Sequence, residues 1–591
     1  MKKLQLLVCC IWVLTFACGP QQDAGNELLS VSETMDRIVT RMYAEWDSET
    51  LDTLSHEFIE QSLRPLEKES LATQYWKFQV NVPVTVSLMR DKAQKKIPFW
   101  LESSGFRRTP MEVKNEIYTY EVWQKNFDSG KVELGINGFG KHRPVYFLAL
   151  APQKPSDELT VSPVFPQEQH IEKFREGAFT YHDWDGLVLT EVPESLQGQQ
   201  LLTTIRGRAR EAHLVDAFRS TDFPSGDRPD QLLLTWSEDP ARSIDIQWRT
   251  SENIAKGMVH YWKKGSADTL QLAVDPYLME DRLLQNDRFM HRFTAKLREL
   301  DPGSAYGYRV GSTSGAWSEV QSFSTSASQA LPFSFIWFGD VHNSAVWGNL
   351  IQKSERQHPA TEFYFIAGDL VDTGLYRDDW DKLFTYAGET ISRKPLLAVP
   401  GNHDSQDGLG AWMYEKMLSL PADSPAGMEG RSYAFTYQNT LFLMMDVTLP
   451  LSEQTAWLEK KLRESEATWK IAVFHFPPYN GVEPYTDIQD LWGPIFDRYQ
   501  VDLVLGGHFH YYMRSEPIRN GKVQTDPKEG TIYWISIGTT GKNKDIEREP
   551  YAAVQFPAEH LYQSITIDGK ELRAETINLD GEQVDHFVLT K

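Results

Sequence analysis

Oxygen and imidazole side chains recur in this chain directly after short apolar runs, a placement that could hold metal ions. Five apolar runs between residues 333 and 505 each end in a polar segment that contains Asp, Asn or His. Carboxylate, amide and imidazole donors without a thiolate suit Fe, Mn or Zn. The five segments are Gly339-Asp340-Val341-His342, Gly368-Asp369-Leu370-Val371-Asp372, Gly401-Asn402-His403-Asp404, His475-Phe476-Pro477-Pro478 and Gly506-Gly507-His508-Phe509-His510.

The apolar runs predict the scaffold that positions these segments. From Leu331 onward, short apolar runs alternate with helical patterns, which is typical of βαβ units. The carboxyl ends of strands in such sheets open onto one edge, where ligands bind. The glycines let the backbone turn sharply and approach closely. We therefore expect the five segments to meet in space.

The order GDxH, GDxxD, GNHD, H and GHxH is similar to that of the calcineurin-like metallophosphoesterases. The resemblance covers residues 331–591 and implies a four-layer α/β sandwich with two divalent or trivalent metal ions, either Fe, Mn or Zn. It also implies the ligands. The first ion would be bound by Asp340, His342 and His510, the second by Asn402, His475 and His508, and Asp369 would bridge both.

The same resemblance implies a hydrolytic mechanism. Two ions about 3.5–4 Å apart share one phosphate and lower the pKa of bound water from about 15.7 toward about 7, which provides hydroxide to attack phosphorus. His403 would protonate the leaving oxygen, and Asp404 would orient and charge His403. Asp372 would support the site without binding metal. Tyr376, Arg377 and Arg514 are candidates for substrate contact, with a solvated surface position as the alternative.

Residues 230–327 carry short strand patterns separated by turns, which indicates a β-sandwich. Segments such as Gln247-Trp248-Arg249-Thr250 resemble the fibronectin-type domain that precedes the catalytic domain in purple acid phosphatase-like proteins. There is one departure from those proteins. They place a tyrosine where this chain has Asp372, and they lack a histidine where it has His342. The tyrosinate colour is therefore not expected, and an acid pH optimum does not follow.

The length of 591 residues predicts about three or four domains. Residues 25–225 are expected to form a mostly β accessory domain of unknown type. It opens with a helix, because Ser30 and Glu33 suit a capping box and an apolar stripe follows at helical spacing. The segment Ser220–Pro229 has the composition of a linker. The fold class is thus multidomain, with the accessory domain and sandwich before the α/β domain.

Residues 1–22 have the pattern of an export signal, with Lys2 and Lys3 before a short apolar run. Ala17-Cys18 at its end resembles a bacterial lipoprotein signal, so we expect Cys18 to be lipidated. The alternative is an ordinary cleaved signal peptide. All three cysteines lie in this segment, which excludes a disulfide framework in the mature chain. The predicted location is a membrane lipoprotein that faces the periplasm or the cell surface.

The formal net charge of −22 makes a nucleic-acid partner unfavourable, since an acidic surface repels phosphate backbones. The predicted partner is a small phosphate ester. The first hypothesis is a phosphomonoesterase. A phosphodiesterase, for example one that acts on cyclic nucleotides, is the second, because the same metal site permits both. A surface binding lipoprotein is the third. The sequence leaves the oligomeric state open.

Overall fold

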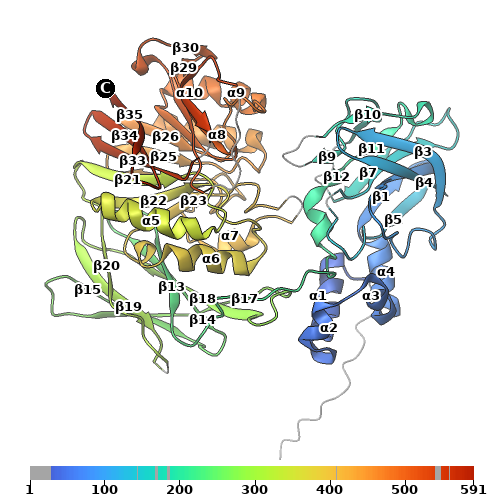
Figure 1. The fold of residues 1–591 in the computed structure, drawn as a ribbon, viewed down its shortest axis with the longest axis horizontal. Coiled ribbons are helices and arrows are strands. Elements are labelled where there is room, and N and C mark those ends of the chain that lie inside the picture. Colours follow the sequence, from blue (N-terminus) through green and yellow to red (C-terminus); the bar gives the residue numbers. More distant parts are fainter. Residues whose placement is uncertain are drawn as a thin grey trace, which may run out of the picture.

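The computed structural model describes residues 28–142, 144–166, 171–182, 187–313, 315–406, 409–539, 547–557 and 559–591. Figure 1 shows an accessory domain beside a larger body, in which a β-sandwich packs under an α/β domain. The predicted signal at 1–22, with Cys18, lies outside the described residues. Within them, no helix is long and apolar enough to cross a membrane.

The first helix of the accessory domain is capped as its sequence predicts. The backbone N–H of Glu33 donates to the Ser30 hydroxyl at 3.2 Å, and the Ser30 N–H donates to the Glu33 carboxylate at 3.0 Å. Each bond satisfies a donor that the first helical turn would leave unpaired. An apolar stripe at helical spacing is buried beneath this helix, so its prediction is confirmed. The stripe comprises Met35, Ile38, Val39 and Met42.

The rest of the accessory domain is a set of β-sheets preceded by short helices. The expectation of a mostly β domain holds, and its first two strands, Trp76–Val80 and Val84–Asp91, are separated at Pro83, which lacks the N–H that a continuous ladder needs. Sheets of three and seven strands have the orders β5-β1-β7 and β10-β3-β4-β2-β6-β11-β8, and β12 pairs with β9. The elements are α1 (Val31–Glu45), α2 (Ser48–Asp52), α3 (His56–Ser62), α4 (Pro65–Thr73), β1 (Trp76–Val80), β2 (Val84–Asp91), β3 (Arg107–Asn115), β4 (Thr119–Phe127), β5 (Gly130–Leu134), β6 (Phe147–Pro152), β7 (Val161–Phe165), β8 (Ile171–Lys173), β9 (Tyr181–His182), β10 (Leu189–Glu191), η1 (Glu194–Leu196), β11 (Gln200–Leu202), β12 (Thr204–Ile205) and η2 (Arg206–Arg210).

The sandwich consists of two antiparallel four-stranded sheets, with the orders β13-β14-β18-β17 and β16-β15-β19-β20. The predicted strands fall on β13, β14, β15 and β19. The likeness to a fibronectin-type domain remains a prediction. The bounds are β13 (Asp230–Thr235), β14 (Ile244–Ser251), β15 (Gly257–Lys263), β16 (Leu270–Val274), β17 (Tyr277–Glu280), β18 (Phe289–Leu297), β19 (Ala305–Gly311) and β20 (Gln321–Ser324).

The α/β domain has two sheets that face each other, with the ring centroids of Phe335 and Phe442 5.2 Å apart across the interface. Helix α5 covers the first sheet, where Trp347 packs 4.9 Å from Phe338. Helices α8, α9 and α10 share a core with the second sheet, so the layers run helix, sheet, sheet, helix (Figure 1). The sheet orders are β23-β22-β21-β33-β34-β35 and β24-β25-β26-β27-β31-β28-β32.

The five predicted strands are present, and they are divided between the two sheets of the four-layer sandwich. β21, β22 and β23 are parallel neighbours in the first sheet, and β26 and β27 are parallel neighbours in the second. The bounds are β21 (Phe333–Phe338), α5 (Ala345–Gln357), β22 (Thr361–Ala367), α6 (Arg377–Ala387), η3 (Thr390–Ser392), β23 (Leu396–Val399), α7 (Trp412–Met417), β24 (Tyr433–Tyr437), β25 (Thr440–Met444), α8 (Leu451–Glu464), β26 (Trp469–Val473), α9 (Thr486–Leu491), α10 (Gly493–Tyr499), β27 (Leu503–Gly506), β28 (Tyr511–Ser515), β29 (Ile518–Arg519), β30 (Lys522–Val523), η4 (Pro527–Glu529), β31 (Ile532–Ile535), β32 (Ala552–Pro557), β33 (Leu561–Asp568), β34 (Glu571–Asn578) and β35 (Gln583–Thr590).

Candidate metal centre

Three groups of metal-ligating atoms form where β21, β22, β26 and β27 end. In each group, one ligand atom from each of three residues lies within 4.8 Å of the others. Every histidine and aspartate that was predicted to bind metal belongs to at least one group, together with His403. The groups are Asp340, His342 and His510; His342, Asp369 and His403; and Asp369, His475 and His508.

Asp369 occupies the position between the other ligands. Its Oδ2 atom lies 3.1 Å from Nε2 of His475 and 3.9 Å from Nε2 of His342. These two histidines come from different sheets, since His342 follows β21 and His475 follows β26. One carboxylate is therefore shared by the two halves of the site.

Backbone N–H groups orient the two central carboxylates. The His403 N–H donates to Oδ1 of Asp369 at 2.9 Å, and the His508 N–H donates to Oδ1 of Asp340 at 2.8 Å. The neighbouring glycine makes each contact possible. A Cβ on Gly401 would lie 2.2 Å from Oδ1 of Asp369, inside the van der Waals limit. With Oδ1 engaged, the second oxygen of each aspartate is left to face the histidines.

Three of the ligands lie in the left-handed backbone region. The φ angles are 47° at His342, 51° at Asp369 and 71° at His508. This conformation is uncommon for residues other than glycine, and such strain collects at functional sites when the surrounding structure enforces it. The Asp369 carbonyl accepts the N–H groups of Val341 and His342, both at 3.1 Å, which fixes the first two loops against each other.

Buried polar atoms without partners test whether the residues fit metal ions. Oδ2 of Asp340 and Oδ1 of Asn402 are buried, and neither has a hydrogen-bond partner among the described residues. Buried polar atoms are otherwise almost always paired. The donor set of carboxylate, amide and imidazole is one that Fe, Mn and Zn accept. The residues therefore fit cations.

The electrostatics of the cluster favour positive charge at its centre. Burial acts to raise the pKa of Asp340, but the charge of His475 and the nearby His342 and His510 rings hold it well below its usual value. Burial acts to lower the pKa of His475, but Asp369 and Asp340 raise it to about 9. The carboxylates thus stabilise cationic charge between them, as bound metal ions require.

Asp404 does not take the position predicted for it. Its carboxylate accepts backbone N–H groups from Leu370 at 3.0 Å, Val371 at 3.1 Å and Gly401 at 2.9 Å. Burial and the nearby Asp369 charge raise its pKa to about 7. Asp404 therefore holds the loops after β22 and β23 together and does not orient the His403 ring.

The His403 ring is oriented by a backbone carbonyl that sequence reasoning missed. Nδ1 of His403 lies 2.7 Å from the carbonyl oxygen of Asp372, and Nδ1 of His475 lies 2.8 Å from that of Ala367. A carbonyl can only accept, so each Nδ1 carries the proton and Nε2 is available to the site. The Asp372 carboxylate lies 3.2 Å from Nδ1 of His342, so it supports a ligand without joining the ligand groups.

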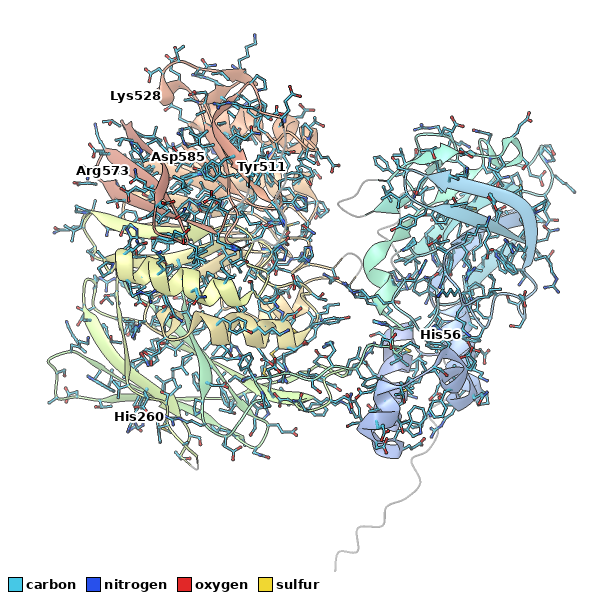
Figure 2. The ribbon with its side chains drawn as sticks, viewed as in Figure 1. His56, His260, Tyr511, Lys528, Arg573 and Asp585 are labelled. Atoms are coloured by element: carbon cyan, nitrogen blue, oxygen red, sulfur yellow. The ribbon has the colours of Figure 1, made fainter. Side chains whose placement is uncertain are left out.

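Two of the three candidate substrate contacts are engaged elsewhere. Arg377 is fully buried and pairs with Asp287 at 2.6 Å, so its predicted surface position is wrong. Arg514 pairs with Asp585, labelled in Figure 2, at 2.7 Å. Tyr376 is half-buried and lines a pocket with residues of the accessory domain and the sandwich.

Comparison with known proteins agrees with this geometry. Residues 333–512 match the family model described as Calcineurin-like phosphoesterase, and residues 229–325 match the one described as Purple acid Phosphatase, N-terminal domain. Probable purple acid phosphatase 20 of Arabidopsis thaliana is 27% identical over 334 residues, which cover 53% of this chain and 72% of that protein. Fe(3+)-Zn(2+) purple acid phosphatase 12 of Arabidopsis thaliana is 22% identical over 357 residues, which cover 55% and 74% respectively.

A solved structure extends the likeness of the fold. The purple acid phosphatase PPD1 from yellow lupin (Lupinus luteus) seeds superposes with a TM-score of 0.52 at 14% identity, and the match covers 88% of this chain and 91% of that chain. The resemblance identified from the metal-binding segments is thereby confirmed.

Proposed function

We propose that this chain, a hydrolase of the calcineurin-like phosphoesterase family, hydrolyses phosphate monoesters at a centre of two metal ions. The observation that carries the proposal is the place of Asp369, whose carboxylate lies between the His342 side and the His475 side of the site. A carboxylate in this position brings two cations close enough to share one phosphate group.

The ligand assignment is the one that the family resemblance implies, and the groups are compatible with it. Two ions bound together neutralise the charge of a phosphate ester and acidify water near neutral pH. Asp369 would bridge both ions, and three donors would bind each of them. The donors are Asp340, His342 and His510 on one side, and Asn402, His475 and His508 on the other.

The identity of the metals is part of the proposal. One relative is named an Fe(3+)-Zn(2+) enzyme, and the donors in this chain accept Fe, Mn or Zn. Asp372 occupies the place of the tyrosine that gives purple acid phosphatases their colour. We therefore expect a metal-loaded protein without that visible absorption band.

His403 is the proposed donor to the leaving group. Its Nδ1 proton is held by the Asp372 carbonyl, and one of its ring nitrogens lies within 4.8 Å of the His342 and Asp369 ligand atoms. When Nε2 is also protonated, the ring can pass that proton to the departing oxygen. The Asp372 carbonyl keeps Nδ1 protonated before and after this transfer, so it acts as a positioning group.

The experiment is hydrolysis of a monoester and a diester of one chromophore, with and without a chelator. Faster release from the monoester, abolished by the chelator and restored by Fe, Mn or Zn, supports the proposal. Preference for the diester would replace it with a phosphodiesterase. Hydrolysis of neither by a protein that binds no metal would favour a surface binding protein.

The variant Asp369→Asn tests the metal centre and keeps the rest of the fold unchanged. We expect it to lose one or both ions by elemental analysis and to lose activity by more than about 100-fold. Asp423→Asn is the matched control, because this carboxylate is exposed and belongs to none of the ligand groups. Full metal content and turnover in Asp369→Asn would refute the shared-carboxylate site.

We also propose that the chain is exported and anchored through a lipid on Cys18. The basis is the signal pattern of residues 1–22. One acyl chain binds weakly, so stable anchoring would need several chains. Cys18→Ser should release the protein from the membrane fraction. Its persistence there would count against the lipid anchor.

A further inference from the structure

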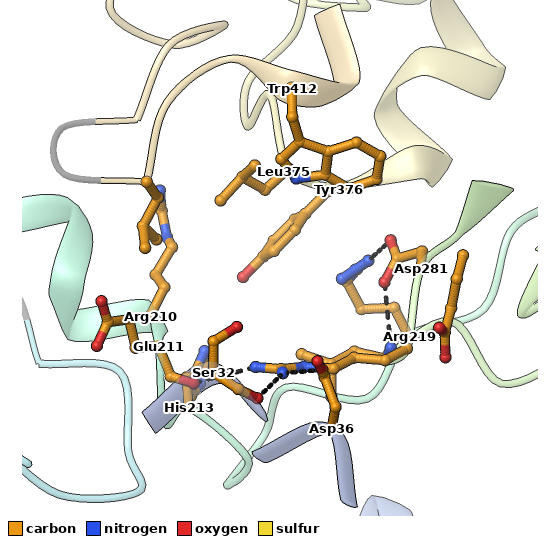
Figure 3. Close-up of a pocket in the computed structure, with 14 residues that line it drawn as sticks. Ser32, Asp36, Arg210, Glu211, His213, Arg219, Asp281, Leu375, Tyr376 and Trp412 are labelled. Atoms are coloured by element: carbon orange, nitrogen blue, oxygen red, sulfur yellow. Dashed lines mark hydrogen bonds and ion pairs between the residues drawn. The ribbon is translucent and has the colours of Figure 1, made fainter. Parts of the chain in front are cut away.

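A pocket lies between the accessory domain and the metal-bearing loops. Its volume is about 390 Å³, which is within the range of small-molecule sites. Leu375, Tyr376 and Trp412 form the wall on the α/β side, and Arg210 and His213 belong to the wall of the accessory domain. Figure 3 shows the hydroxyl of Tyr376 directed into the middle of this space. We call it the junction pocket.

The wall on the α/β side is fixed to His403, the proposed proton donor. The carbonyl oxygen of His403 accepts the Gly374 N–H at 2.8 Å and the Gln406 side-chain amide at 2.8 Å. Gly374 lies two residues before Tyr376 in the chain, and Gln406 lies six residues before Trp412. Tyr376 follows Asp372 by four residues, a span of at most about 14 Å. The loops that carry Tyr376 and Trp412 are therefore continuous with those that hold His403.

The carboxylates that line the pocket are already paired. Asp36 pairs with Arg282, Glu211 with Arg208, and Glu280 with Arg288. Asp281 pairs with Arg219, whose guanidinium stacks 3.7 Å from the centre of the Tyr376 ring. These pairs, two of which Figure 3 marks with dashed lines, leave little negative charge uncompensated in the pocket.

The pocket also carries donors that the fold does not use. Arg210 has no carboxylate within ion-pair distance among the described residues, and its guanidinium lies 5.9 Å from the Tyr376 ring centre. Nη1 of Arg219 is buried without a hydrogen-bond partner in the described part of the chain. Arg219 also pairs with Asp378 at 3.0 Å, so Arg210 supplies the uncompensated positive charge and Arg219 a spare N–H donor near the same aromatic ring, a combination that suits an anion.

We propose that the junction pocket is the leaving-group subsite, and that Arg210 and Arg219 bind a second anionic group on the substrate. The inference rests on the proposed phosphomonoesterase function. The substrate class is then a phosphate ester whose alcohol carries a carboxylate or a second phosphate. Trp412 and Leu375 contact the body of that alcohol, and the accessory domain sets specificity through Arg210.

The experiment compares three substrate series of increasing chain length: alkyl monophosphates, ω-carboxyalkyl phosphates and α,ω-alkanediol bisphosphates. Release of inorganic phosphate gives kcat/KM for each. We expect the wild-type protein to prefer an anionic tail, and Arg210→Ala to lower the ratio of anionic-tail to neutral-tail kcat/KM by about tenfold. Arg210→Lys should restore part of the ratio. The two anionic series show whether carboxylate or phosphate is recognised.

The matched control is Arg175→Ala, which removes an exposed arginine elsewhere in the accessory domain and should leave the ratio unchanged. A ratio unaffected by Arg210→Ala would overturn the subsite while the phosphatase reaction stands. Calorimetric binding of non-hydrolysable phosphonate analogues provides the second readout. If wild type hydrolyses no ester yet binds the anionic-tail phosphonate through Arg210, the subsite stands and the reaction fails. Equal binding of both tails overturns the subsite.

Discussion

The junction between the sandwich and the α/β domain differs in kind from the junction between the sandwich and the accessory domain. At the sandwich junction, Trp236 is 1% exposed and its ring centre lies 5.3 Å from that of Phe363, within one continuous apolar core. At the accessory junction, Arg282 of the sandwich pairs with Asp36, whose side chain is 61% exposed, and Leu283 of the sandwich packs into the accessory core. A continuous core makes the sandwich part of the catalytic fold, whereas the accessory domain keeps a core of its own, which Leu283 of the sandwich enters, and is therefore a separate module.

This difference matters for function because the two junctions support different parts of the site. The sandwich junction supports helix α6 through Asp381, whereas the accessory junction encloses the junction pocket. The firmly packed sandwich junction thus lies beneath the metal-binding loops, and the weaker accessory junction lies where the body of the substrate would bind. Variants at each junction test this division.

The largest effect is expected from Trp236→Ala. Removing a buried indole costs about 3–5 kcal/mol, because the lost contacts and the cavity add. We expect the free energy of unfolding to fall by about 4 kcal/mol. The sandwich and the α/β domain should unfold in one cooperative transition, measured by denaturant unfolding with circular dichroism. Trp412→Ala, which truncates a partly exposed indole at the accessory junction, is the control and should cost less than about 1 kcal/mol. Equal losses of unfolding free energy in the two variants would show that the two junctions do not differ.

The second variant is Asp381→Asn, which removes a fully buried charge at the sandwich junction. Asp381 accepts hydrogen bonds from Arg249 at 2.7 Å, Gln231 at 3.0 Å and Thr221 at 3.0 Å. Leaving Arg249 with a single carboxylate partner should cost about 3 kcal/mol. The same measurement applies, with Asp36→Asn as the exposed counterpart. A neutral result would show that the buried network does not hold the junction.

The sequence predicted the metal-binding loops well because their signals are local. A strand that is buried on both faces is a continuous apolar run, and a glycine next to Asp or His marks the turn after it. The resemblance implied two sheets, but the residues alone did not show which strand joins which sheet, since periodicity does not specify strand pairing. The role of Asp404 was missed for a related reason: its partners are backbone N–H groups, which leave no side-chain pattern.

The accessory domain was predicted less completely. Helix α1 has a capping box and a long apolar stripe, but α2 and α3 contain five and seven residues, too few for a clear periodicity. The linker Ser220–Pro229 has loop composition, yet Thr221 and Ser225 are fixed by Asp381 and Asp287. Those partners lie far along the chain, as do the walls of the junction pocket. Contacts of this kind become visible only in the folded structure.

The third prediction concerns pH at the accessory junction. Burial, helped by the charges of Lys141, Arg210 and Arg219, lowers the pKa of His213 from 6.5 to about 4, although its hydrogen bond to the Val215 carbonyl acts to raise it. Between these pH values the unfolded chain binds a proton that the folded protein does not, so the free energy of unfolding falls as pH drops from 6.5 toward 4. The full shift corresponds to about 3 kcal/mol, and solvent in the pocket should reduce this to about 1.5 kcal/mol.

The variant His213→Gln isolates that effect from the other titrating groups. We expect unfolding free energies of the variant to fall less than those of wild type between pH 7 and pH 4.5, by about 1.5 kcal/mol. His260→Gln, in the sandwich and outside the pocket, is the comparison. If the free energy of unfolding of His213→Gln fell with pH as steeply as that of wild type, His213 would not be held neutral at the junction.

The smallest effect is expected from Arg282→Ala. An ion pair with one strongly exposed partner contributes less than about 1 kcal/mol, because water and salt screen it. The loss should shrink further in about 1 M salt, where the Debye length is about 3 Å. Unfolding measured at low and high salt checks both statements. A salt-independent loss above about 2 kcal/mol would mean that the accessory domain is held as firmly as the sandwich, and the junction pocket would then be a rigid part of the catalytic body rather than a space between modules.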